Sequence, residues 1–202
     1  MGSDRPMDLP FLRLAGRELL PIVQGGMGVG VSAHRLAGSV AACNAVGTLA
    51  SVDLRRHHPD LMARTTHLGN DAAAKATIDA ANLEALDREI RAARRLAHGR
   101  GVLAVNVMRA VAEYAPYVRR ACESGIDAVV VGAGLPLDLP ELTAEHPRVA
   151  LIPILSDARG IALILKKWER KGRLPDAIVI EHPRLAGGHL GAARLEDLDD
   201  PR

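Results

Sequence analysis

The sequence predicts an α/β fold built on a parallel sheet. Short runs rich in Val, Ile and Leu alternate with segments in which apolar residues recur every three or four positions. Short, continuously apolar runs are typical of strands buried on both faces, as in a parallel sheet covered by helices. The predicted strands are 21–24, 46–50, 102–107, 128–131, 149–155 and 177–181.

The segments between these runs carry helix signals. Most follow a residue whose side chain commonly caps a helix N-terminus, and several end just before a glycine. Cys43 and Cys122 fall inside these helices, and we expect both to lie in the core. The predicted helices are 33–45, 83–98, 111–122, a short helix after 138 and a last one over 157–168, with Ser32, Asn82, Asp138 and Ser156 as N-caps.

One segment, 51–81, fits neither pattern and is predicted to be a long loop between the second strand and its helix. Loops of this length are usually functional or contain an unrecognised element. We interpret its His57–His58 pair as part of a solvated loop.

Two architectures fit six alternating strands and helices: an open doubly wound sheet and a closed (β/α)₈ barrel. Strand starts run from residue 21 to residue 177, a mean spacing of about 31 residues. Eight such units need about 250 residues. A barrel in this chain of 202 residues would therefore have about six of its eight units, within one domain over 1–202.

Composition excludes several classes of protein. The chain has 26 Lys and Arg against 24 Asp and Glu, a net charge of +2, and only 2% aromatic residues, which argues against nucleic-acid binding. No apolar stretch reaches the length of a membrane span, and the N-terminus lacks the apolar region of a signal peptide. With only two distant cysteines, we expect a cytoplasmic protein without disulfides or a metal site.

A glycine-rich turn, Gln24-Gly25-Gly26-Met27-Gly28-Val29-Gly30, follows the first strand. Gly28, Gly30 and Ala33 match the looser dinucleotide fingerprint, with Asp53 as its acidic residue. Glycine also serves any tight turn with positive φ. A structural turn and a close backbone approach to a flat ligand therefore both remain open.

A glycine-flanked histidine, His189, follows the sixth strand, and His182 precedes it. An imidazole with an ordinary pKa near 6.5 can accept a proton at neutral pH. His189 is therefore the first candidate for a general base and His182 the second. Asn106, at the end of the third strand, is a further polar candidate.

Three segments resemble one family: QGGMG after the first strand, VNV in the third, and AGGHLG after the sixth. Together with ILSDARG and KKWERKGRLPDA, they resemble the nitronate monooxygenases, formerly called 2-nitropropane dioxygenases, over about residues 20–195. The resemblance implies an FMN enzyme on a (β/α)₈ barrel. Such enzymes oxidise alkyl nitronates or nitroalkanes with dioxygen to a carbonyl compound and nitrite.

The resemblance also assigns roles by position. It implies that His189 is the general base that removes the proton next to the nitro group. The residues it places against the flavin are Gly25, Gly26, Met27, Asn106, Glu181, Gly187 and Gly188.

The family holds the flavin phosphate with loops after strands seven and eight, which would lie beyond Arg202. We therefore expect a barrel truncated at the C-terminus. Two alternatives stay open: a flavin-dependent enoyl-acyl-carrier-protein reductase that uses a nicotinamide, and an inactive truncated fragment. The sequence does not fix the oligomeric state, so a homo-oligomer also stays open.

Overall fold

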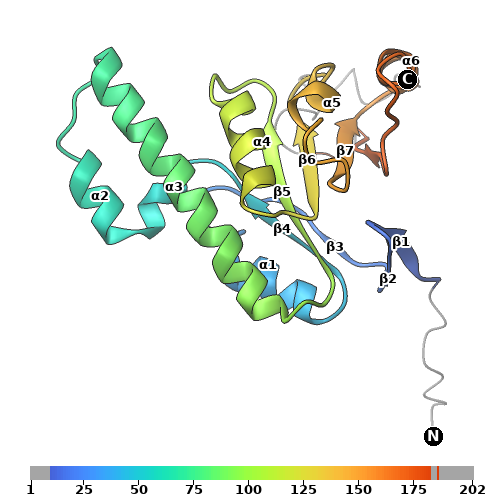
Figure 1. Cartoon of the computed structure of the whole chain (residues 1–202), viewed down its shortest axis with the longest axis horizontal. Helices are drawn as coiled ribbons and strands as arrows, with labels where there is room; N and C mark the ends of the chain where they lie inside the picture. The colour runs from blue at the N-terminus through green and yellow to red at the C-terminus, as the bar shows by residue number, and fades with distance from the viewer. Residues whose placement is uncertain (1–9, 183–185, 187–202) are drawn as a thin grey trace, which may run out of the picture.

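The computed structural model describes residues 10–182 and 186, and its centre is a curled sheet of six parallel strands (Figure 1). The strands follow one another across the sheet in chain order, and each pairs in parallel with the next. The sheet is a half-barrel, a partial (β/α)₈ barrel, as predicted. Its strands are β3 (Val23–Gln24), β4 (Val46–Ala50), β5 (Val102–Met108), β6 (Ala128–Gly132), β7 (Ala150–Leu155) and β8 (Val179–Ile180).

This strand order decides between the two architectures that the sequence left open. A doubly wound sheet reverses its strand order at a switch point, where a dinucleotide binds, and this sheet has no reversal among its described strands. Asp53, the acid of the dinucleotide interpretation, instead pairs with Arg56 and lies 3.3 Å from Arg55 Nε. The dinucleotide interpretation is therefore wrong.

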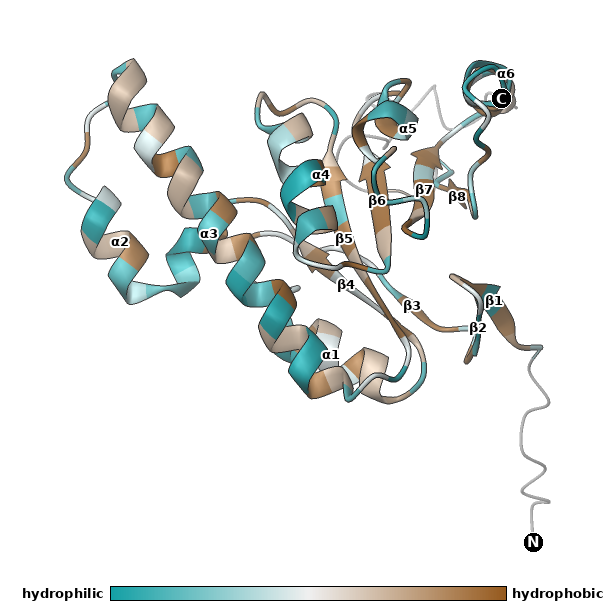
Figure 2. Ribbon diagram, viewed as in Figure 1, coloured by the Kyte–Doolittle hydropathy of each residue, from teal (hydrophilic) through white to brown (hydrophobic). Residues whose placement is uncertain are grey.

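Helices cover the outer face of the sheet (Figure 1). Figure 2 shows the strands as the most apolar part of the chain, with polar residues on the outward surfaces of the helices. Outward-facing strand residues such as Leu49, Val105 and Leu151 share one core cluster with Leu86, Ile90 and Trp168 of the helices. The main helices are α1 (His34–Ala42), α3 (Ala72–Ala97), α4 (Tyr114–Glu123), α5 (Leu139–Leu142) and α6 (Ala158–Glu169).

An N-terminal hairpin that the sequence did not predict closes the inner face of the sheet at one end. It consists of β1 (Leu12–Leu14) and β2 (Arg17–Leu19), paired antiparallel through a two-residue turn at Ala15 and Gly16. Both turn residues have positive φ, as in the tight turns that join hairpin strands. Its buried leucines, Leu14 and Leu19, share a second core cluster with small inward-facing residues of the sheet: Val46, Val102, Ala104, Ala128 and Ala150.

The segment 51–81 is mostly helical rather than a loop. It contains a 3₁₀ turn, η1 (Leu54–His57), the helix α2 (Pro59–Thr65) and the start of α3. The N-cap of α3 is Asp71, whose Oδ1 accepts a hydrogen bond of 2.8 Å from Ala74 N. The predicted cap, Asn82, lies inside the helix, where its Oδ1 accepts from Arg55 N at 3.2 Å. The prediction failed because the Ala-rich start of α3 has high helix propensity but no apolar period.

Other cap predictions were also corrected. α6 begins after Asp157, not Ser156, and Asp157 Oδ1 accepts from Gly160 N at 2.7 Å. Asp138 does precede α5, but its side chain makes no cap hydrogen bond. The N-cap of α1 is Ala33, without a side-chain cap, because the hydroxyl of Ser32 has other partners.

The two cysteines lie in different environments. Cys122 is buried in α4, as predicted, and burial raises the pKa of its thiol to about 11. Cys43 is exposed, so its prediction as a core residue was wrong. It lies at the C-cap of α1, one residue beyond the helix. Among the described residues, no helix is long and apolar enough to cross a membrane.

Candidate active site

Parallel strands end at the same edge of a sheet, here called the carboxyl edge, and the opposite edge is the amino edge. In (β/α)₈ barrels the catalytic groups lie at the carboxyl edge. The predicted site residues that the structure describes lie there: Gly25, Gly26 and Met27 after β3, Asn106 in β5 and Glu181 after β8. Gly187, Gly188 and His189 lie outside the described residues.

Gly26 and Asn106 are in direct contact, although β4 lies between their strands. A Cβ added to Gly26 would lie 2.5 Å from the Asn106 Cβ and 3.0 Å from its Cγ. No side chain fits at such distances, so only glycine lets the turn pass this close to the asparagine. At Gly28, by contrast, an added Cβ would meet nothing within 4 Å. The sequence predicted both contact residues for the site but not their contact.

Gln24, at the end of β3, holds the start of the turn. Its side-chain Oε1 accepts a hydrogen bond of 3.0 Å from Thr48 N, and its Nε2 donates to Thr48 O at 3.1 Å. The amide side chain thereby continues the pairing of β3 with β4 beyond the last paired backbone residue. The sequence places Gln24 in the glycine-rich turn but does not predict this role.

Ser32 closes the turn from within. It is fully buried, and its Oγ accepts hydrogen bonds from Met27 N at 2.8 Å and Gln24 Nε2 at 2.9 Å. The same hydroxyl donates to Gly25 O at 3.1 Å, while Ser32 N donates to Met27 O at 3.0 Å. Both polar backbone groups of Met27 are therefore used inside the turn, although the residue as a whole is 45% exposed. The side chain of Ser32 thus organises the turn rather than capping α1.

Two hydroxyls near the turn are buried and have no hydrogen-bond partner among the described residues: Thr48 Oγ1 and Ser51 Oγ. The alternation of β4 places Thr48 on the inner face of the sheet with Val46 and Ala50. An unsatisfied buried hydroxyl costs about 1–3 kcal/mol, so a bound polar group or water would stabilise it. Together with the close approach at Gly26, this arrangement fits a flat, polar ligand at the carboxyl edge.

Glu181 lies on the same edge as Asn106, with two strands, β6 and β7, between β5 and β8 in the sheet order. Its backbone N donates to Leu155 O at 2.9 Å, which extends the pairing of β8 with β7. The next residue, His182, accepts a hydrogen bond from Ala186 N at 2.9 Å through its carbonyl. The end of β8 therefore places Glu181 along the same edge as the glycine turn.

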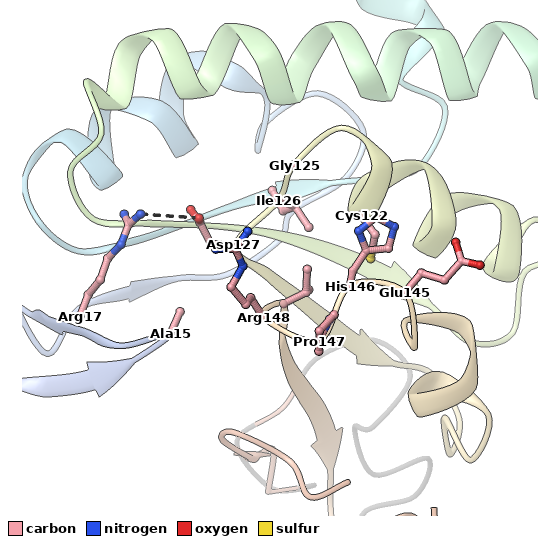
Figure 3. Close-up of a pocket in the computed structure, with 11 residues that line it drawn as sticks. Ala15, Arg17, Cys122, Gly125, Ile126, Asp127, Glu145, His146, Pro147 and Arg148 are labelled. Atoms are coloured by element: carbon pink, nitrogen blue, oxygen red, sulfur yellow. Dashed lines mark ion pairs between the residues drawn. The ribbon is translucent and has the colours of Figure 1, made fainter. Parts of the chain in front are cut away.

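A cavity of about 420 Å³ lies at the amino edge (Figure 3). It is lined by the hairpin and by the loops that precede β6 and β7. Figure 3 shows Arg17 reaching from the hairpin toward Asp127, which lies 3.7 Å from it and 3.4 Å from Arg94. Asp127 also accepts a hydrogen bond from Leu103 N at 3.0 Å. These contacts hold the hairpin and strand starts together, so we assign this cavity to stability rather than catalysis.

Comparison with known proteins gives one family and a set of similar folds. The family described as nitronate monooxygenase matches residues 17–200. No group of His, Cys, Asp and Glu in the described part of the chain could hold a metal ion. A comparison with curated protein sequences gives no match.

Two solved structures have TM-scores of 0.52: FabK from Thermotoga maritima, at 18% identity, and a mutant form of it, at 19%. They are matched over 79% and 82% of this chain, but only 40% and 45% of theirs. Nitroalkane oxidase from Streptomyces ansochromogenes has 16% identity and a TM-score of 0.33, with 80% of this chain and 64% of that one covered. At these identities the FabK matches show a shared fold, and this chain spans less than half of those structures.

Proposed function

The chain belongs to the nitronate monooxygenase family, and we propose on that premise that it carries the flavin-binding carboxyl edge of an FMN-dependent oxidoreductase. Its substrates are alkyl nitronates or nitroalkanes, which are oxidised with dioxygen to a carbonyl compound and nitrite. The observation that carries the proposal is the contact between Gly26 and Asn106, which brings backbone and an amide together at the catalytic edge of the sheet.

Three described residues would hold the cofactor nearest the turn: Gly25, Gly26 and Asn106. The glycines leave room for backbone to approach a flat ring, and the Asn106 amide can donate to or accept from its polar edge. Met27 would contact the ring through its exposed side chain, because its backbone groups bond to Ser32. Glu181, Gly187 and Gly188 would line the other end. Bound FMN would supply the oxidation–reduction chemistry.

His189 would hold and move the proton. A nitro group acidifies the neighbouring carbon, and a neutral imidazole placed beside it can accept that proton through a ring nitrogen. A nitronate has already lost this proton. The role of His189 is therefore specific to neutral nitroalkanes.

Substitution of His189 tests this assignment. A general base contributes about 10²–10⁴-fold, so we expect His189→Asn to lower turnover of neutral nitroalkanes by that factor. Oxidation of the preformed nitronate falls much less, and flavin content stays unchanged because the imidazole does not hold the cofactor. Steady-state rates on both substrate forms, with flavin absorbance measured alongside, provide the readout.

His182→Asn is the matched control and leaves both rates near wild type. Equal losses on nitroalkane and nitronate at full flavin occupancy would reject His189 as the base. Oxidation of a reduced nicotinamide with an enoyl thioester, without nitronate turnover, would contradict the proposed function and favour the reductase alternative.

A further inference from the structure

Glu89 is a buried carboxylate that the proposed function does not use. It lies in α3, its side chain is 1% exposed, and α3 packs against α1 (Figure 1). Its Oε2 accepts a hydrogen bond of 2.7 Å from His34 N and lies 2.8 Å from His34 Nδ1. Its Oε1 lies 3.1 Å from His58 Nε2. An isolated buried carboxylate is strongly unfavourable, so the hydrogen bonds with His34 are needed to stabilise it, whereas His58 Nε2 lies close to it without a hydrogen bond.

Glu89 supplies the cap that α1 lacks. The N-cap residue of α1, Ala33, has no side chain that can accept a hydrogen bond from the first turn. The carboxylate accepts the first amide of the helix from a different helix and places negative charge at its positive end. α1 begins two residues after Ser32, so this contact fixes the end of the glycine turn, as Gln24 fixes its start.

His57, the residue that precedes His58, contacts the turn directly. A Cβ added to Gly30, which has φ of +80°, would lie 1.7 Å from His57 Nε2, so the His57 ring packs against the turn backbone. His58 is only 17% exposed and faces Glu89, so the pair is not the fully solvated segment predicted from sequence. A cavity of about 540 Å³ is lined by Gly30, the start of α1, the His57–His58 pair and Glu89.

We propose that Glu89 is a positioning residue for the glycine turn 25–32, acting through His34 and His58. It holds the far end of the turn, so that Gly26 stays against Asn106 at the carboxyl edge. The proposal rests on the proposed function, because the position of the turn matters to a cofactor only if this edge binds one. The cluster therefore acts on flavin binding from outside the sheet, without touching the flavin.

The test compares Glu89→Gln with Glu84→Gln. Glu84 lies on the same helix, but it pairs with Arg64 at 2.9 Å and with Arg88 near the surface, away from the turn. Amide hydrogen exchange is measured on the chain without flavin, and FMN is then titrated with its fluorescence and visible absorption as readouts. Loss of a charged hydrogen bond changes a local opening equilibrium by about tenfold or more.

We therefore expect Glu89→Gln to speed exchange in 27–36 by about tenfold or more and to weaken FMN binding by a similar factor. We also expect it to alter the absorption band of the bound flavin, which a loss of stability alone would leave unchanged. Glu84→Gln changes none of these. Should Glu89→Gln fail to fold, His58→Asn removes one contact of the cluster and is expected to produce the same effects at smaller size.

Unchanged exchange in 27–36 in these variants would overturn the proposal. Faster exchange with unchanged FMN affinity and spectrum would overturn it as well, because Glu89 would then only stabilise the fold. If the wild-type chain fails to bind FMN, the proposed function fails and the cofactor role of Glu89 fails with it. The exchange data still decide separately whether Glu89 holds the turn.

Discussion

Gly26 shows how a single missing side chain shapes the candidate site. Its α-carbon approaches Asn106 so closely that a methyl group would overlap the Asn106 Cβ. The sequence predicted each residue for a different reason, one from a glycine turn and one from the end of a strand. Their contact could not be predicted, because it depends on how two strands separated by β4 are twisted and spaced.

Gly26→Ala is expected to lower the free energy of unfolding by about 1–3 kcal/mol, the usual cost of overpacking, and to weaken FMN binding. Gly28→Ala is the matched control, since an added Cβ there meets nothing within 4 Å. Chemical denaturation and FMN titration measure the two effects. Asn106→Gly in the Gly26→Ala background removes the overlapping Cβ and restores part of the stability. No restoration would show that the contact is not the cause.

The hydrogen bonds that shape the turn were also beyond sequence reasoning. Gln24 and Ser32 both act on backbone groups, and backbone partners leave no signature in residue type. Thr48, the partner of Gln24, lies on the neighbouring strand, 24 positions along the chain. Only the register of β3 against β4 reveals this contact.

The strands of the parallel sheet could be predicted from sequence, whereas the start of α3 and the N-terminal hairpin could not. Continuous Val, Ile and Leu runs locate buried parallel strands well, because both faces of the sheet exclude polar residues. The start of α3 was missed because its first turns are exposed and rich in alanine, so no apolar stripe marks them. The hairpin was missed because its three-residue strands are too short to show alternation.

The cap of α6 makes a testable contribution to stability. A hydrogen bond from Gly160 N lowers the pKa of Asp157 from 3.8, although partial burial opposes this shift. A carboxyl group whose pKa is lowered by folding stabilises the folded state at any pH above its pKa in the unfolded chain. This contribution is lost as the pH falls through the pKa of the group in the folded protein. Asp157→Ala removes this cap, so we expect its free energy of unfolding at neutral pH to be about 0.5–2 kcal/mol lower than that of wild type.

Asp157→Asn is the informative comparison, because asparagine caps a helix but does not titrate. Between pH 6 and pH 3, we expect wild type to lose more stability than Asp157→Asn, as measured by urea unfolding at each pH. Identical pH dependence in the two proteins would show that the carboxylate of Asp157 contributes no charge-dependent stabilisation.

At the scale of the whole molecule, the hairpin and the sheet form one unit. The inner face of the half-barrel is apolar, and the hairpin leucines complete the cluster on it. The glycine turn lies at the opposite edge, so stability and the proposed chemistry are separated across the sheet. In (β/α)₈ barrels generally, the carboxyl edge carries the catalytic groups and the amino edge contributes to stability.

Leu19→Ala tests whether the hairpin supports the sheet. Leu19 is fully buried, and truncation of a buried leucine to alanine costs about 2–5 kcal/mol. Its neighbour Leu20 is 40% exposed, so Leu20→Ala serves as the control and changes stability by much less. Urea denaturation of both variants gives the comparison. A loss at Leu19 no larger than at Leu20 would mean that the hairpin does not seal the inner face.

The most direct test of the account maps where FMN binds. Amide hydrogen exchange is followed on the chain as FMN is raised to millimolar concentration, with Gly26→Ala as the matched variant. We predict saturable protection in 25–32 and around Asn106 at the carboxyl edge, loss of that protection in Gly26→Ala, and no change around Asp127 at the amino edge. Protection confined to the amino-edge cavity, or none at saturating FMN, would contradict a flavin site at the glycine turn.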